Sequence, residues 1–457
     1  MRLLTVQSKS PLSTLFVTSL LGVQTVQASI TLDLGSPESI KDATKQVSAG
    51  LVKYYTGYKP GDVPGNLPSP YYWWEAGAMF AALIDYWFYT GDSQYNDITT
   101  QAMLHQVGTD KNFMPSNQSA SLGNDDQAFW GIAAMTAAEN KFPNPPNDKP
   151  QWLELAQAVV HSQIPRWDAD TCGGGLRWQI FSFNKGFPYK NTISNGCFIN
   201  IAARLALYTK NDTYAKEVEK HWEWMADIGL ISPTWQIFDG TDSLKNCSQL
   251  NHIQWTYNNG VLLAAAAAMY NYTNGADIWK KRLDGLIDGA GVFFSKDPPD
   301  VMTEVACEAN GKCGVDQRSF KAYLARWMAL TIRIAPYTRE KLMPRLQASA
   351  KAAALQCNGP ENACGLRWTM GAAYDGSTGV GEQMSALEIM QAHLLDYVGG
   401  PANNKTGISR GNPNAGTGKE TKYTKLSDIT TKDRVGAGFL TSVILLSVLG
   451  SAWWMLS

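Results

Sequence analysis

The 457-residue sequence has almost no net charge, few histidines and few signals for β-strands. Its 39 basic and 40 acidic residues give a formal charge of −1, so there is no electrostatic reason to expect nucleic acid as a partner. The five histidines are scattered, and no two cysteines have the C-x-x-C spacing of a zinc site. We therefore expect no metal and no cofactor. Tryptophan and tyrosine are abundant, with 16 and 19 residues, which suits stacking on sugar rings but also a large core.

The N-terminal end carries the pattern of a secretory signal. Arg2 and Lys9 precede an apolar core over residues 12–23, and small residues lie near Ala28. The apolar core is well short of the roughly 20 residues that a membrane-spanning helix needs. We therefore expect a signal peptide over residues 1–28.

The C-terminal end matches an attachment signal for a glycosylphosphatidylinositol (GPI) lipid. Residues 435–457 form an apolar tail, and residues 399–434 are rich in Gly, Asn, Thr, Ser and Lys, which predicts a flexible linker. Two candidate attachment regions remain open, Asn414-Ala415-Gly416 and Ser427-Asp428. A plain C-terminal membrane anchor is the alternative. Either arrangement predicts a domain outside the cell, at the outer face of the plasma membrane or in the cell wall.

Cysteines and glycosylation sequons agree with an extracellular location. Cys307 with Cys313, and Cys357 with Cys364, bracket short segments that predict local disulfides in an oxidising compartment. The other three cysteines are odd in number, so one thiol is expected to be free. Their pairing is open from the sequence: Cys172, Cys197 and Cys247. Five Asn-x-Ser/Thr sequons predict N-glycosylation at Asn117, Asn211, Asn246, Asn271 and Asn404.

Residues 29–398 form the predicted working domain, and similar apolar segments rich in Ala and Gly recur within it. Each is apolar on most faces, as expected of a helix buried inside a larger assembly. They cover 73–91, 125–139, 190–209, 255–273, 318–334 and 381–395. Segments with a one-sided apolar stripe alternate with them, the first opening at the N-cap Ser36-Pro37 and the others covering 93–107, 150–164, 212–228, 275–289 and 338–355.

This alternation predicts an all-α fold, an (α/α)6 toroid of six inner and six outer helices, rather than an irregular helical bundle. Loops would gather at the two ends of such a barrel. The segment IFSFN at 180–184 is the one candidate for a short hairpin arm.

The stretch SLGNDDQAFW, residues 121–130, places Asp125 and Asp126 side by side at the start of an inner helix. Helix capping explains acids at this position, because the helix dipole favours negative charge there. A cap needs only one acid, however, and in the toroid both would face an aromatic-lined barrel mouth. Carboxyl groups on neighbouring residues can lie ~5–5.5 Å apart, the separation that a retaining glycosidase uses. An inverting pair, ~6.5–9.5 Å apart, is harder to reach from adjacent positions.

Other polar and aromatic residues are expected at the same barrel end. Aromatic rings pack on sugar faces, and amide or carboxyl groups bind hydroxyl pairs. The candidate substrate contacts are Trp74, Gln127, Trp130, Trp178, Asn195, Tyr257, Asn258 and Glu382, with Trp73, Glu75, Asn259 and Gln383 at matching levels.

Four motifs occur in order along the domain: YYWWEAGAMFAALIDYWFYTGDSQYN, GNDDQAFWGIAAMTAAE, CGGGLRWQI with YKNTISNG, and WTYNNGVLLAAAAAMY. With them the chain resembles glycoside hydrolase family 76, the α-1,6-mannanases, over nearly all of residues 30–398. It is most similar to the fungal GPI-anchored branch that is required for cell-wall biogenesis. The resemblance implies an (α/α)6 fold and retention of configuration. It also implies that Asp125 is the nucleophile and Asp126 the acid/base.

The resemblance leaves the acceptor open. The bacterial relatives hydrolyse mannan backbone, whereas the fungal branch is implied to cleave the α-1,6-mannose link in the GPI glycan of other proteins and to pass them to wall glucan. We expect a cell-surface enzyme that cleaves α-1,6-mannosides, with transglycosylation as its physiological outcome and hydrolysis of mannan as the alternative.

Two further functions compete with this interpretation. Isoprenoid cyclases are also helical toroids, but their magnesium-binding DDxxD motif needs a third acid. Here Asp125-Asp126 is followed by Gln127-Ala128-Phe129. A noncatalytic polysaccharide-binding protein of the wall would keep the aromatic residues but would not need adjacent acids.

Overall fold

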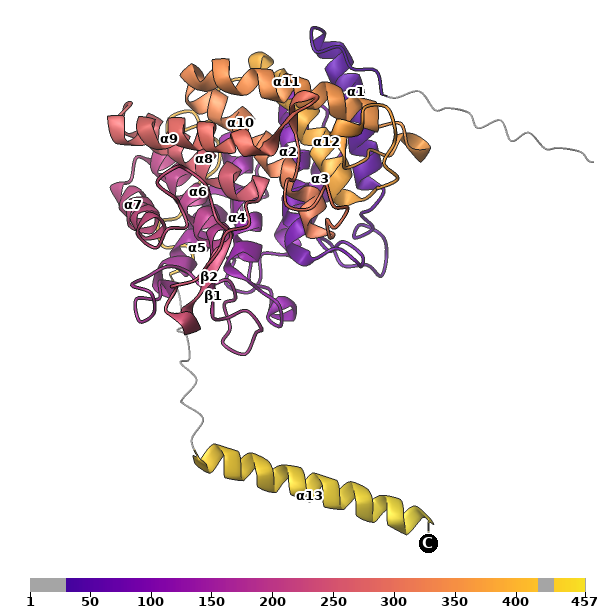
Figure 1. The fold of residues 1–457 in the computed structure, drawn as a ribbon, viewed down its shortest axis with the longest axis vertical. Coiled ribbons are helices and arrows are strands. Elements are labelled where there is room, and N and C mark those ends of the chain that lie inside the picture. The colour runs from indigo at the N-terminus through magenta and orange to yellow at the C-terminus, as the bar shows by residue number, and fades with distance from the viewer. Residues whose placement is uncertain (1–29, 418–430, 457) are drawn as a thin grey trace, which may run out of the picture.

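The computed structural model describes residues 30–417 and 431–456. The predicted signal peptide at 1–28 and the candidate attachment pair Ser427-Asp428 lie outside the described residues. Secondary structure in the described part is mostly helical, with five short strands (Figure 1).

Six helices form a closed ring at the centre of the domain. Each packs against the next, and the sixth packs against the first. They are α2 (Trp73–Thr90), α4 (Asn124–Glu139), α6 (Thr192–Thr209), α8 (Thr256–Tyr272), α10 (Phe320–Ile334) and α12 (Val380–Gln391). Nearly every residue of these helices is buried, as the absence of a polar face in their sequences predicts.

A second set of six helices surrounds the ring. They are α1 (Pro37–Val52), α3 (Asn96–His105), α5 (Trp152–Gln163), α7 (Asp212–Asp227), α9 (Asp277–Gly289) and α11 (Arg339–Gln356). Helices α3, α5, α7 and α9 each pack on the inner helix that precedes them in the chain, and α1 and α11 pack on α12. The predicted (α/α)6 architecture is therefore confirmed within the described residues.

Small residues let the inner helices approach closely. Gly77 of α2 lies under the indole of Trp130 in α4, where a Cβ atom would come within 2.9 Å of the ring. Trp130 is fully buried and stacks between Trp73 and Phe113. The Ala and Gly content of the inner segments thus reflects packing density at the ring interfaces.

The strands lie in the connections between helices. β1 (Tyr189–Asn191), β2 (Gly240–Asp242) and β3 (Leu250–Asn251) form an antiparallel sheet in that order, and β4 (Phe294–Lys296) pairs with β5 (Pro299–Met302). The expected hairpin arm at 180–184 is wrong, because these residues form bends and turns. The chain there is held by an isolated bridge between Gln179 and Gly123 and not by a partner strand.

The first half of the predicted flexible linker is part of the folded domain. Residues 400–417 lie against the outer surface of α5 and are fixed by hydrogen bonds to the ends of α4 and α6 and along α5. Polar, Gly-rich composition predicted mobility because the segment buries little apolar surface of its own. Its backbone is satisfied instead by groups that the helices present.

All disulfides expected from the sequence are present, and the structure settles the remaining pairing. Cys307 is bonded to Cys313 and Cys357 to Cys364, which confirms both predictions. Cys172 is bonded to Cys247, and Cys197 is a buried free thiol.

The five sequon asparagines are all exposed: Asn117, Asn211, Asn246, Asn271 and Asn404. Their glycosylation stays a prediction. At Asn271 the amide nitrogen that would carry a glycan donates a hydrogen bond to the carbonyl of Ile334.

The C-terminal helix α13 (Thr431–Leu456) is long and apolar enough to cross a membrane. Its segment Arg434–Trp453 has a mean hydropathy of 1.9 over 20 residues. This agrees with the predicted apolar tail in extent.

A buried lysine holds together the loop that precedes β1. The Lys190 ammonium group donates to the carbonyls of Asp168, Thr171 and Gly174 and lies 3.2 Å from the Asp168 carboxylate. We predict that Lys190→Met lowers the free energy of unfolding by about 1–3 kcal/mol, because three carbonyls lose their donor, while the partly buried Asp168 carboxylate keeps its ion pair with Arg177. Chemical denaturation measures this, with exposed Lys216→Met as the matched control. Equal stability of the two variants would contradict the prediction.

Candidate active site

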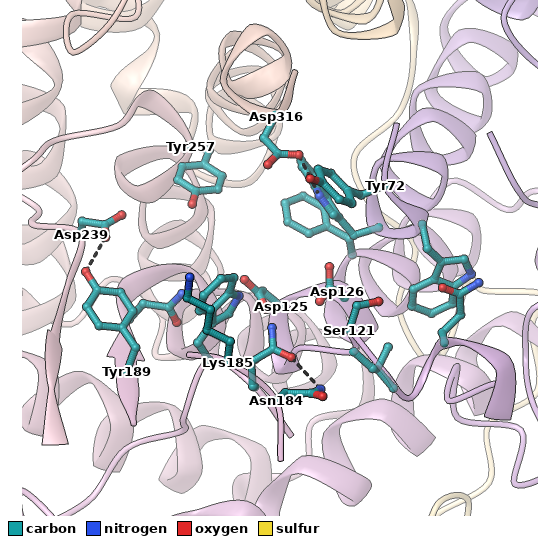
Figure 2. A pocket seen from close by; sticks show the side chains of 18 of the residues that line it. Tyr72, Ser121, Asp125, Asp126, Asn184, Lys185, Tyr189, Asp239, Tyr257 and Asp316 are labelled. Carbon is teal, nitrogen blue, oxygen red and sulfur yellow. Dashed lines mark hydrogen bonds between the residues drawn. The ribbon is translucent and has the colours of Figure 1, made fainter. Parts of the chain in front are cut away.

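A cavity of about 610 Å³ opens where the inner helices begin (Figure 2). Its volume is in the ~300–1,000 Å³ range of small-ligand sites. Many aromatic residues line it: Tyr72, Trp73, Trp74, Phe129, Trp178, Tyr189, Trp255, Tyr257 and Phe320. Four aspartates lie among these rings: Asp125, Asp126, Asp239 and Asp316. Acidic groups framed by ring faces are suited to a neutral, hydroxyl-rich ligand such as a carbohydrate.

Asp125 and Asp126 occupy the first turn of α4, side by side in the cavity (Figure 2). The chain enters the helix through Gly123, whose backbone is extended, and the N–H of Asn124 donates to the carbonyl of Trp178 at 2.8 Å. The Asp126 carboxylate accepts a 2.5 Å hydrogen bond from the N–H of Gly123. Asp126 is therefore a helix cap as well as a cavity residue, so the two explanations of the pair are compatible.

Gly123 sits between the two carboxyl groups. A Cβ atom at this position would lie 2.3 Å from Oδ1 of Asp125 and 2.7 Å from Oδ2 of Asp126. Any side chain here would displace both acids. The absence of a side chain at Gly123 is thus a steric requirement of the aspartate pair.

The environment raises the pKa of both acids. Burial is the main cause for Asp126, whose pKa rises to about 7 with a contribution from Asp316, against the opposing hydrogen bond from Gly123. For Asp125, burial and the neighbouring Asp126 carboxylate raise the pKa well above its usual range. Oδ1 of Asp125 is buried and has no hydrogen-bond partner among the described residues. Both shifts favour the protonated carboxyl form, which is the form an acid catalyst needs.

A buried polar network fixes the start of α4 from behind. Arg166 donates to Oδ1 of Asn124 and to Oε1 of Gln127, and the amide of Gln127 donates to the carbonyl of Asn112. Gln163 donates to the carbonyl of Asn124. Gln127, an expected substrate contact, is fully buried in this network and does not line the cavity.

Three of the expected substrate contacts line the cavity: Trp74, Trp178 and Tyr257. The indole N–H of Trp74 donates to Asp316 at 3.2 Å, which fixes the ring. Tyr257 stacks on Phe320 with the ring centroids 3.7 Å apart. Trp178 is 36% exposed and forms part of the rim.

The other expected contacts lie behind the cavity wall. Trp130 packs in the core, and both amide atoms of Asn258 are buried without a partner in the described structure. Asn195 clamps the backbone of Leu176 with its amide group. Glu382 is paired with Arg318 at 3.2 Å. None of these side chains lines the cavity beside the aspartate pair.

The structure adds two acids that sequence reasoning missed. Asp239 accepts a 2.5 Å hydrogen bond from the Tyr189 hydroxyl and a second from Asn251 at 3.1 Å, so its carboxylate is held at one end of the cavity. Asp316 lies across the cavity from the pair (Figure 2). The sequence position of Asp316, just before an inner helix, could have identified it as a cavity residue, because the inner helices begin at the mouth of the barrel. The sequence around Asp239 carries no such signal, because the position of Asp239 depends on strand pairing between distant segments.

The fold and the site together define a class of protein, the helical-barrel enzymes that act on carbohydrates with a pair of carboxyl groups. The family model of glycosyl hydrolase family 76 matches residues 39–405. The chain belongs to glycosyl hydrolase family 76 and is a glycoside hydrolase.

Relatives from fungi are similar over nearly the whole chain. The mannan endo-1,6-alpha-mannosidase DCW1 of Saccharomyces cerevisiae is 47% identical over 431 residues, covering 93% of this chain and 95% of the relative. A crystal structure of Dfg5 from Chaetomium thermophilum in complex with glucosamine is 46% identical, with a TM-score of 0.81, covering 84% of this chain and 97% of that one.

A bacterial structure shares the fold. It is an inactive variant of an α-1,6-mannanase from Salegentibacter, with two successive aspartates replaced by asparagine, in complex with α-1,6-mannotriose. It is 17% identical, with a TM-score of 0.61, and covers 78% of this chain and 99% of that one.

We predict that Gly123→Ala reduces activity on α-1,6-mannotriose at least about 100-fold, because the added methyl group displaces both carboxyl groups from their working positions. The φ angle of −93° suits alanine, so the fold is expected to persist. Gly400→Ala, where a Cβ meets no atom within 4 Å, is the matched control. Activity and far-UV circular dichroism of both variants are the measurements; an active, folded Gly123→Ala enzyme would contradict the assignment.

A second prediction concerns stability against pH. The pKa of Asp126 is about 7 in the folded state and ~3.9 in the unfolded state. Between these pH values the folded protein holds a proton on Asp126 that the unfolded protein has lost. The free energy of unfolding therefore falls as the pH rises through this window. Asp126→Asn does not ionise and its side-chain oxygen can still accept from Gly123. Its melting temperature should equal that of the wild type near pH 3.5 and exceed it by a few degrees near pH 8.

The matched control for this comparison is Asp110→Asn, which replaces an exposed acid outside the cavity. Thermal unfolding across the pH series is the measurement. A difference between Asp126→Asn and wild type that is constant with pH would show that ionisation of Asp126 is not its cause.

Proposed function

We propose that the chain is a retaining endo-α-1,6-mannosidase of the fungal cell surface, in which Asp125 is the nucleophile and Asp126 the acid/base. The observation that carries this proposal is the pair of adjacent carboxyl groups, with raised pKa values, in an aromatic-lined cavity. The names of the fungal relatives and the mannotriose bound to the bacterial relative support the substrate class.

In the first step Asp125 forms a bond from its carboxylate oxygen to the anomeric carbon of the mannosyl unit. The glycosidic C–O bond breaks, and Asp126 transfers its proton to the leaving oxygen. Burial raises the pKa of Asp125 in the free enzyme. The positive charge that develops on the sugar during the reaction has the opposite effect, because it stabilises the ionised form of Asp125. Within the described part of the chain, Oδ1 of Asp125 makes no hydrogen bond.

In the second step the ionised Asp126 takes a proton from the incoming hydroxyl group, whose oxygen displaces Asp125 from the anomeric carbon. Two inversions give net retention. With water the outcome is hydrolysis, and with a sugar hydroxyl it is transfer. We propose transfer as the physiological outcome, moving GPI-anchored proteins onto wall glucan. The aromatic lining of the cavity supports this, because a carbohydrate acceptor would find stacking surfaces that water does not use.

We place the enzyme outside the cell, attached to the membrane by a GPI lipid at its C-terminal end. Three disulfides support an oxidising compartment, and the apolar helix α13 supports a C-terminal attachment signal.

The experiment incubates the enzyme with α-1,6-mannotriose or with a GPI-core glycan. Each substrate is tested with and without a β-glucan oligosaccharide as acceptor. NMR identifies the anomer that forms first, and mass spectrometry identifies the products. We expect α-configured products and, with acceptor, a mannosyl–glucan adduct. Asp125→Asn should abolish turnover while its melting temperature does not fall, with Asp110→Asn as the active control.

Each outcome bears on a different part of the proposal. A β-configured first product would refute retention, and wild-type turnover by Asp125→Asn would refute its role as nucleophile. Hydrolysis alone in the presence of acceptor would refute transfer, leaving mannan hydrolysis. Binding without any turnover by the wild type would indicate a polysaccharide-binding protein.

A further inference from the structure

Ser194 places a buried hydroxyl group beside the aspartate pair. The residue lies in the first turn of α6, is fully buried and does not line the cavity. Helix α6 packs against α4, whose first turn carries Asp125 and Asp126. Because the Ser194 hydroxyl is closed off from the cavity, it can act on a bound sugar only through a neighbouring side chain.

The start of α6 is held in place by its own cap and by the neighbouring sheet. The side chain of Asn191, the N-cap residue, accepts from the N–H of Ser194 at 3.2 Å. The N–H of Thr192 donates to the carbonyl of Asp239 at 2.8 Å, and the Thr192 hydroxyl donates to the carbonyl of Phe238 at 2.5 Å. These contacts fix the backbone at Ser194, while the hydrogen of its hydroxyl group can still turn toward an acceptor.

Two buried oxygen atoms at this place lack a hydrogen bond of regular geometry within the described part of the chain. They are Oγ of Ser194 and Oδ1 of Asp125. Burial and then the Asp126 carboxyl group raise the pKa of Asp125, and the Ser194 hydroxyl is among the groups that lie close enough to lower it. A buried polar atom without a partner is unfavourable, so the hydroxyl and the carboxyl group gain from pairing. Catalytic hydrogen bonds are often long in the free enzyme and shorten when substrate binds.

Asp125 forms no ion pair with a basic side chain in the described part of the chain, although Lys185 lines the same cavity. The ionisable groups that face Asp125 are Asp126 on its own helix, Cys197 of α6 and Tyr257 of α8, and none of these is a cation. The groups that favour its ionised form are the N–H groups of the first turn of α4 and the hydroxyl group from α6. The hydroxyl group therefore adds to the stabilisation that the helix N-terminus gives.

We propose that Ser194 is a positioning residue for the reaction: its hydroxyl group donates to the Asp125 carboxylate, stabilises its charge and holds it for attack on the sugar. The proposal rests on the proposed function, in which Asp125 is the nucleophile. The same hydrogen bond stabilises Asp125 as the departing carboxylate when the second step releases it. Asp126 has its own donor, the N–H of Gly123 at 2.5 Å, so each acid is held from a different side.

Steady-state kinetics of Ser194→Ala on α-1,6-mannotriose test this role. We expect kcat to fall about 10–100-fold, the usual effect of one lost hydrogen bond to a charged group, and KM to change little because Ser194 does not line the cavity. Loss of the donor raises the pKa of Asp125, so the acid limb of kcat/KM should move to higher pH. Thr331→Val is the matched control, because it removes a buried hydroxyl that also has no partner in the described structure, near the far end of α10. It should change neither the rates nor the pH profile.

A substrate whose leaving group needs no proton separates the two acids. With dinitrophenyl α-1,6-mannobioside, the first step needs the nucleophile but not the acid catalyst. The initial release of dinitrophenolate should therefore remain slow in Ser194→Ala and be nearly restored in Asp126→Asn. Restoration in Ser194→Ala would overturn the proposal, because the hydroxyl would then serve Asp126. A loss of activity without a shift of the acid limb would overturn it as well, since Ser194 would then have only a structural role.

Thermal unfolding provides a readout that does not need activity. The Ser194 hydroxyl affects the pKa of Asp125 only in the folded state, so the destabilisation of Ser194→Ala relative to wild type should grow from about pH 5 to about pH 9. In the Asp125→Asn background this growth should disappear. A difference that is constant with pH would overturn the proposal. If the wild type does not cleave mannosides, the proposed function fails, but the unfolding series still decides whether the hydroxyl supports charge on Asp125.

Discussion

Two neighbouring carboxyl groups must share one small volume without both being charged, and the rest of the active site is arranged around this constraint. The first turn of α4 places Asp125 and Asp126 on either side of Gly123, which has no side chain to separate them. The N–H of Gly123 stabilises charge on Asp126, while burial and the facing Asp316 oppose it. On balance these surroundings raise the pKa of both carboxyl groups and favour their protonated form, which an acid catalyst needs.

The ring of inner helices explains how such a site is kept rigid. Helices begin at the cavity end, so their first turns bring Trp74, Asp125, Tyr257 and Phe320 to one place. Buried polar side chains behind the wall hold these turns: Arg166 joins Asn124 to Gln127, and Asn195 fixes Leu176. These residues position the site without touching the cavity. Polar residues at the starts of the inner helices therefore have two roles. Those that line the cavity can contact a ligand, and those that are fully buried hold the helix ends in place.

Helix α5 links the C-terminal segment 400–417 to the start of α4, where the aspartate pair lies. Ser409, Asn412 and Ala415 are held along α5, and Gln163 at the end of α5 donates to the carbonyl of Asn124. The C-terminal segment and the start of α4 are therefore both fixed by the same outer helix.

The sequence by itself determined the twelve helices, the aspartate pair and both short disulfide loops. Helical periodicity, small-residue runs and short cysteine spacings are local, so they can be read without knowing what packs where. Only the tertiary structure decided that Gln127, Trp130 and Asn195 lie behind the cavity wall, that Asp239 lines it, and that Cys172 bonds to Cys247. It also decided that residues 400–417 are docked, because their polar backbone is satisfied by groups on α4, α5 and α6 far away in the chain. Such partners are set by long-range packing, which leaves no periodic signal in the segment itself.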